Sequence, residues 1–158
     1  MSSAERAFAR HDAYSEDGDG YRLETTAFEG RVHVDDGYRL VVRAPTLGAA
    51  VEEEVGPALQ EGWFETFQLR LEDAPGAVRG HVELEELTVT SVDDEVVVEM
   101  AFELHPGRAP DVAKALAEYV EGTYMEGVVP GYSYRPPVSE MLARARQGEG
   151  DDRGPMPL

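Results

Sequence analysis

The chain contains no cysteine, and this absence excludes disulfide bonds and metal sites built on thiolates. Isoleucine and asparagine are also absent, and lysine occurs only once, at Lys114. The other basic residues are arginines, so 14 basic residues stand against 32 acidic ones and the formal net charge is −18. This balance argues against nucleic acid and anionic membranes as partners, because phosphate binding needs clustered Lys and Arg.

Long apolar runs are missing as well. No stretch approaches the ~18–20 consecutive apolar residues that a membrane-spanning helix needs. The N-terminal residues MSSAERAFARHD contain neither the apolar core nor the processing site of a secretory signal peptide. We therefore expect a cytoplasmic protein with no membrane partner.

The excess of carboxylates has two interpretations. One is a functional acidic surface, such as a mimic that binds a basic protein. The other is adaptation to molar salt inside the cell. Lysine, whose long apolar stem needs hydration, is nearly eliminated, and the carboxylates are spread along the chain instead of forming one block. Both features favour a halophilic protein.

Apolar residues at every second position predict the centre of the fold. From Val96 to Leu104 every second residue is apolar, which is typical of a half-buried strand. Asp36-Gly37, between two more alternating segments, predicts a second hairpin. Apolar stripes at helical spacing predict helices over 46–60 and 108–126, and Gly56-Pro57 predicts a kink in the first, or two short helices meeting there.

These elements indicate an α+β fold: a mainly antiparallel twisted sheet of about five to six strands, with helices packed on one face. We expect one domain over residues 1–147 and a disordered acidic tail over 148–158. Two further strands are predicted over 63–72 and 80–84, the second joined to the next strand by a β-bulge at Glu85-Glu86.

The segment VVPGYSYRPP, residues 128–137, is the best candidate for a binding site. Tyr132, Tyr134 and Arg135 are of the residue types enriched in binding hot spots, and Trp63 is the only tryptophan. The alternative is a loop that packs its tyrosines over the core.

No catalytic residue can be singled out. Ser133 lacks the Gly-x-Ser-x-Gly surroundings of a nucleophile elbow, and phosphate-binding and dinucleotide-binding motifs are absent. If strands 31–34 and 80–84 were neighbours, His33 and His81 could approach each other, but their spacing matches no metal signature. We expect no metal and no cofactor.

Two stretches, EGWFETFQLRLEDAPG and EGVVPGYSYRPPV, together with the charge and the scarcity of lysine, resemble an uncharacterised family of short acidic haloarchaeal proteins. The resemblance covers most of the chain except the tail. It implies an archaeal origin and no known activity.

Three functional hypotheses follow. The first is a non-catalytic binding or protein-interaction module, with a protein partner or a second copy of the chain. The second is a small-molecule enzyme with a pocket near 128–137. The third is an acidic mimic. A pocket lined by Arg135 and a histidine would favour the enzyme, and an exposed apolar patch would favour the interaction module.

Overall fold

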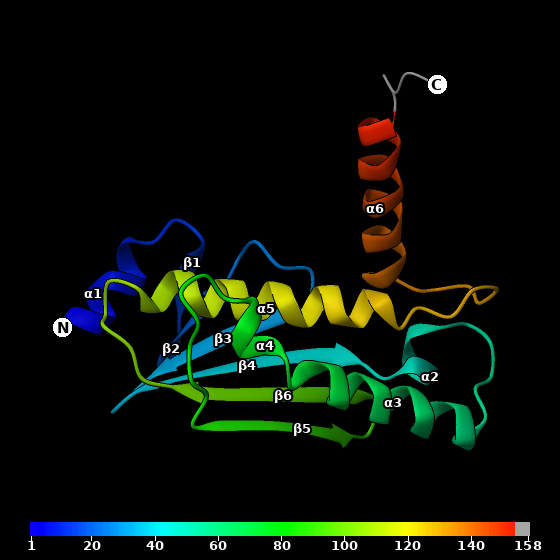
Figure 1. Ribbon diagram of the computed structural model, residues 1–158, viewed down its shortest axis with the longest axis horizontal. Coiled ribbons are helices and arrows are strands. Elements are labelled where there is room, and N and C mark those ends of the chain that lie inside the picture. The colour runs from blue at the N-terminus through cyan, green and yellow to red at the C-terminus, as the bar shows by residue number, and fades with distance from the viewer. Residues whose placement is uncertain (154–158) are drawn as a thin grey trace.

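The computed structural model describes residues 1–153, with side chains described as far as Gln147. Six strands form one antiparallel sheet in the order β1-β2-β3-β4-β6-β5 (Figure 1). Their bounds are β1 Tyr14–Asp17, β2 Gly20–Leu23, β3 Glu29–Val34, β4 Tyr38–Pro45, β5 Glu86–Val92 and β6 Glu95–Phe102. The predicted α+β class and antiparallel sheet are confirmed.

The longest pairing joins β4 to β6 inside the sheet, from Tyr38 opposite Phe102 to Pro45 opposite Glu95. The alternation seen in the sequence sorts their side chains between the two faces. Leu40, Val42 and Met100 are buried on the inner face. The central strands are therefore fixed in register by their apolar pattern.

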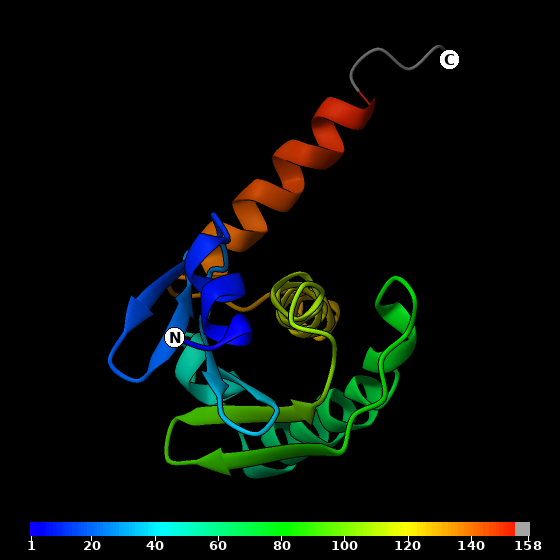
Figure 2. The same ribbon diagram turned by 90° about the vertical axis from the view of Figure 1, so that its left-hand side faces the viewer.

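Helix α5, Ala109–Glu126, fills the concave inner face of the sheet, which curves around it (Figure 2). Pro110 occupies its first turn, and Asp111 lies there at the positive end of the helix dipole. Leu116 and Val120 are fully buried against the sheet core. The other helices are α1 Ser3–Arg10, α2 Leu47–Ala50, α3 Pro57–Leu71, α4 Ala74–Ala77 and α6 Val138–Arg153.

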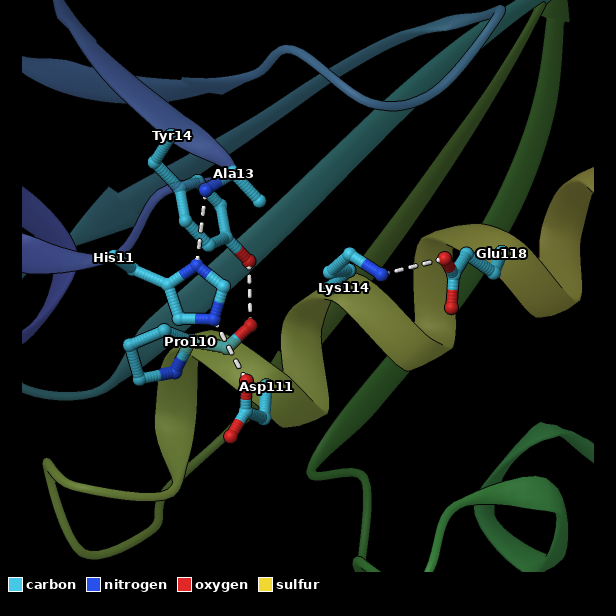
Figure 3. Close-up of polar contacts among 7 residues, drawn as sticks. All are labelled: His11, Ala13, Tyr14, Pro110, Asp111, Lys114 and Glu118. Atoms are coloured by element: carbon cyan, nitrogen blue, oxygen red, sulfur yellow. Dashed lines mark hydrogen bonds and ion pairs between the residues drawn. The ribbon is translucent and has the colours of Figure 1, made fainter.

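The N-terminal segment is tied to the start of α5 by two long-range hydrogen bonds (Figure 3). The Tyr14 hydroxyl donates to the Pro110 carbonyl at 2.7 Å, and burial raises the pKa of this tyrosine. His11 Nδ1 accepts the Ala13 N–H at 3.1 Å, so Nε2 donates to Asp111 at 2.7 Å. These bonds hold the β1 edge of the sheet to α5.

The predicted strand over 63–72 is wrong, because these residues belong to helix α3. Trp63, Phe67 and Leu71 satisfy a helical i, i+4 spacing as well as the period of two. Leu69 decides between them: in a strand it would share their face, but in the helix it is 65% exposed. The predicted helix over 46–60 is divided into α2 and the start of α3, which begins at Pro57.

Residues 80–84 do not form a strand either. Gly80 and His81 have positive φ values of 82° and 59°, which lie outside the β region. Glu85 N–H nevertheless donates to the Ala101 carbonyl at 2.8 Å, while Glu86 is the register partner of the same Ala101. The pairing of β5 with β6 ends at Glu86, so this bond extends the end of the ladder, and the predicted β-bulge between two strands is not formed.

The C-terminal helix α6 projects away from the body of the protein (Figures 1 and 2). Its first turns are held by Val138 and Met141, both buried. The predicted domain boundary after residue 147 stays a prediction, and of the predicted tail residues 154–158 lie outside the described residues. No helix in the described part of the chain combines the length and apolar character of a membrane span.

Candidate functional site

A groove of about 420 Å³ lies between α3 and the C-terminal half of α5. Helix α3 contributes Leu59, Gly62, Trp63, Thr66, Phe67 and Arg70, and the other wall consists of Thr123, Glu126, Gly127, Val128 and Val129. Its lining is mainly apolar with a few polar groups, which is the usual composition of a ligand site. This hollow is the candidate functional site.

Trp63 lines the groove and belongs to an aromatic cluster. Its ring stacks on Phe67 with centroids 5.7 Å apart and meets the edge of Tyr124 at 5.4 Å. The Tyr124 hydroxyl donates to the Pro45 carbonyl at 2.9 Å, so the cluster is anchored to β4. The site is thus fixed to the sheet by rigid aromatic side chains.

Gly127 ends helix α5 beside the indole. A Cβ atom at this position would lie 3.2 Å from Trp63 Nε1. Glycine therefore lets the chain leave α5 close to the tryptophan and place Val128 and Val129 along the groove wall.

Thr123 is the unusual polar residue of the groove. It is only 2% exposed, and its hydroxyl is the one buried side-chain polar atom of the described residues without a hydrogen-bond partner. Leaving a buried hydroxyl unpaired costs roughly 1–3 kcal/mol. This hydroxyl oxygen is closed to solvent, so its cost falls on the fold itself and a molecule in the groove does not reach it in this arrangement.

Of the predicted site residues, only Trp63 lines the groove, while Tyr134 and Arg135 hold its outer wall in place. The Tyr134 hydroxyl accepts the Val129 N–H at 2.8 Å, and partial burial raises the pKa of this tyrosine. Arg135 Nε donates to the Val51 carbonyl at 3.2 Å. Tyr132 is half-buried and packs against the core.

The loop is also tied to the chain after α2. Ser133 N–H donates to both carboxylate oxygens of Glu53, at 2.8 and 3.1 Å, and this hydrogen bond lowers the pKa of Glu53. Tyr134 forms an antiparallel bridge with Val51. Residues 128–137 therefore support the groove more than they line it.

The histidines lie apart from the groove. His33 is on β3, whose neighbours are β2 and β4, whereas His81 precedes β5 near the opposite edge of the sheet. The neighbouring strands that would have brought them together do not exist. Among the described residues no three His, Asp or Glu side chains gather as metal ligands.

Sequence reasoning missed Phe67, Thr123 and the pairing of α3 with α5. The pattern that could have predicted this pairing is the helical i, i+4 spacing of Leu59, Trp63 and Phe67. The same residues also fit the period of two of a strand, so the pattern alone did not identify a helix. Nothing in the sequence indicates that the Thr123 hydroxyl is left without a partner, because that depends on tertiary packing.

The model of one protein family matches residues 9–144, and its description is a family of unknown function (DUF5813). Neither a curated protein nor a solved structure gives a significant match.

Proposed function

Since the chain belongs to the DUF5813 family, whose function is unknown, we propose its role from the groove: a non-catalytic binding or protein-interaction module of a halophilic archaeal cytoplasm. The groove receives an apolar segment of a partner protein. The observation that carries this proposal is the mainly apolar groove between α3 and α5, in whose lining Leu59 stays 42% exposed.

The groove suits one or two large apolar side chains. Leu59 at its mouth is 42% exposed, so binding would bury apolar surface that folding leaves in water. Arg70 and Glu126 supply one charge of each sign at the lining. An apolar anchor in a pocket with a polar rim is the arrangement of interface hot spots.

The lining contains neither a histidine nor Arg135. The lining has one carboxylate, one guanidinium and hydroxyl groups. It has no other side chain that commonly acts as a nucleophile or as the base that activates one. This composition supports binding over the enzyme hypothesis. Whether the partner is a different protein or a second copy is decided by experiment.

Two glycines give a matched pair of variants. Gly62 lines the groove, and Gly122 lies on the exposed surface of α5, and a Cβ atom at either position meets nothing within 4 Å. Replacing a helical glycine stabilises by roughly 0.5–1 kcal/mol, so Gly62→Leu and Gly122→Leu should stabilise similarly. Only the first fills the groove.

We expect wild-type protein and Gly122→Leu to retain the same partner from a native high-salt lysate, and Gly62→Leu to lose it. The purified partner should change the fluorescence of Trp63, the single tryptophan, in the first two proteins only. Equal retention by Gly62→Leu and Gly122→Leu would show that the groove is not the binding site. Sedimentation of the wild type would reveal a second copy as the occupant.

A further inference from the structure

The two edges of the sheet are protected very differently. At one edge β1 has 4 residues, YSED, and two of them are carboxylates. At the other edge β5 has 7 residues, ELTVTSV, and after Glu86 the strand carries neither charge nor proline. Short, charged edges resist pairing with another chain, whereas a long uncharged edge invites it.

The backbone of β5 is open along its outer side. The strand is the outermost one in the sheet, and Figure 1 shows no element beyond it. The two-residue turn after Val92 joins Val92 to Glu95, and in such a turn these two residues form a hydrogen-bonded pair. Along an antiparallel ladder, hydrogen-bonded pairs alternate with pairs that are not hydrogen-bonded, so every second residue of β5 counted back from Val92 bonds to β6. Leu87, Val89 and Ser91 therefore direct their N–H and C=O groups away from β6.

These outward groups have no partner from loops. Among the described residues, no backbone hydrogen bond outside the regular elements involves Leu87, Val89 or Ser91. The edge thus presents three N–H and three C=O groups in strand geometry, the template used in recognition by strand addition.

We propose that the free edge of β5 is a docking site for an extended segment of a partner protein, which joins the sheet as an additional strand. Main-chain hydrogen bonds to Leu87, Val89 and Ser91 would supply the affinity. This site is separate from the groove, and the proposal does not depend on the groove being occupied.

Charge complementarity specifies the chemistry of the segment. The uncharged run Leu87–Val92 is flanked by carboxylates at both ends. These are Glu85 and Glu86 before it, and Asp93, Asp94 and Glu95 after it. A complementary segment has a short β-branched, uncharged centre with Arg or Lys at both ends.

A second copy of β5 fits less well. In an antiparallel β5–β5 pair, the Glu85-Glu86 end of each copy would face the Asp93-Asp94 end of the other. Like charges directly opposite each other destabilise a strand pair. Arg39 contacts Glu86 at 2.7 Å and Arg43 contacts Glu95 at 3.3 Å, so the repulsion between the ends comes from Glu85, Asp93 and Asp94.

The probe is a labelled peptide, Arg-Arg-Val-Thr-Val-Thr-Val-Arg-Arg, and binding is followed by fluorescence anisotropy. Two matched peptides serve as controls: one with N-methyl groups on the five central residues, and one with Glu in place of each Arg. Measurements are made at the lowest KCl concentration at which the protein is folded, because screening weakens charge pairing. We expect both controls to bind at least tenfold more weakly than the probe.

On the protein, Ser91→Pro removes one outward N–H without touching the ladder to β6, and proline is tolerated on such an edge. It should lower the affinity for the probe at least tenfold, whereas Gly62→Leu should leave it unchanged. Equal binding of the N-methylated peptide or of the acidic peptide would overturn the proposal. A wild-type dimer that Ser91→Pro converts to a monomer would also overturn it, by assigning the edge to a second copy. If Ser91→Pro does not fold, the comparison of the three peptides decides alone.

Discussion

The two faces of the sheet are built from alternate residues of the same strands, and they differ in every property. On the concave face, Leu40 and Val42 of β4 are at most 1% exposed beneath α5. On the convex face of the same strand, Arg39 and Arg43 flank a half-buried Val41 and form ion pairs with Glu86, Glu99, Glu29 and Glu95.

The convex face does not carry the excess of acidic residues. By strand register it carries four arginines and five carboxylates: Arg22, Arg31, Arg39, Arg43, Asp17, Glu29, Glu86, Glu95 and Glu99. Its formal charge is thus −1, and the remaining ten basic and 27 acidic residues give the rest of the chain −17. The carboxylates that repel each other therefore lie mostly on the helices, loops and turns, and the convex face of the sheet is nearly balanced.

The largest expected effect is on thermal stability in salt. At the spacing of about 15 Å that 32 carboxylates would have on this surface, each pair costs only ~0.3 kcal/mol in water, but many pairs sum to several kcal/mol. Raising KCl from 0.1 to 3 M shortens the screening length from ~10 Å to below ~3 Å. The melting temperature should rise by roughly 10 °C or more, since each kcal/mol shifts it by about 2–4 °C in a chain of this size.

A melting temperature that stays flat over this range would contradict salt adaptation and revive the functional acidic surface. The same change made on a helix and on the convex face of the sheet makes this test more specific. Substituting Glu by Gln on exposed helix positions such as Glu65 should reduce the gain from salt, because the acidic excess lies there. The same change at Glu95, which is paired with Arg43, should not.

The second largest expected effect is the difference in stability between substitutions at two neighbouring residues of β4, one on each face of the sheet. Val42→Ala creates a cavity in the core and should lower the free energy of unfolding by about 2–3 kcal/mol. Val41→Ala removes the same atoms from the half-buried convex face and should cost less than about 1 kcal/mol. Urea denaturation of both variants measures the difference, and equal losses would mean that the convex face is also a packed core.

A smaller effect is expected for the ion pairs of the convex face. Arg39 contacts Glu86 at 2.7 Å and Glu99 at 3.5 Å, and its side chain is 40% exposed. Arg39→Gln should cost less than about 1 kcal/mol in dilute buffer, and the loss should shrink in molar KCl because exposed pairs are screened. A loss that persists in molar salt would indicate a role in packing instead of charge.

The sheet could be predicted from the sequence because each of its central strands has one buried and one exposed face. Alternation then leaves one interpretation, as in Val96 to Leu104. Helix α3 could not be predicted, because Trp63, Phe67 and Leu71 fit two periods and only the exposure of Leu69 distinguishes them. Strand β1, YSED, carries no apolar alternation that would predict it, since its pairing with β2 depends on tertiary contacts more than on propensity.

Of the four predicted site residues, one, Trp63, lines the candidate site, and the other three lie beside it. Tyr134 and Arg135 attracted notice by residue type, and the structure gives them hydrogen bonds to backbone atoms of Val129 and Val51. Residue type cannot distinguish a tyrosine that contacts a ligand from one that supports a loop. The groove depends on two helices far apart in sequence, and no local pattern encodes their contact.

The smallest predicted effect concerns how this loop responds to pH. The Ser133 N–H hydrogen bond lowers the pKa of exposed Glu53, so the contribution of Glu53 to stability is present above the ordinary glutamate pKa of about 4.3 and is lost as the pH falls through its folded value. Burial raises the pKa of Glu121 on α5, so its contribution has the opposite sign and is lost as the pH rises through its folded value. The free energy of unfolding of wild type minus that of Glu53→Gln should therefore decrease as the pH is lowered from 6 to 3. The same difference for Glu121→Gln should increase over this range. Chemical denaturation followed by Trp63 fluorescence at each pH measures both, and parallel trends for the two variants would show that the Glu53–Ser133 contact does not hold the loop.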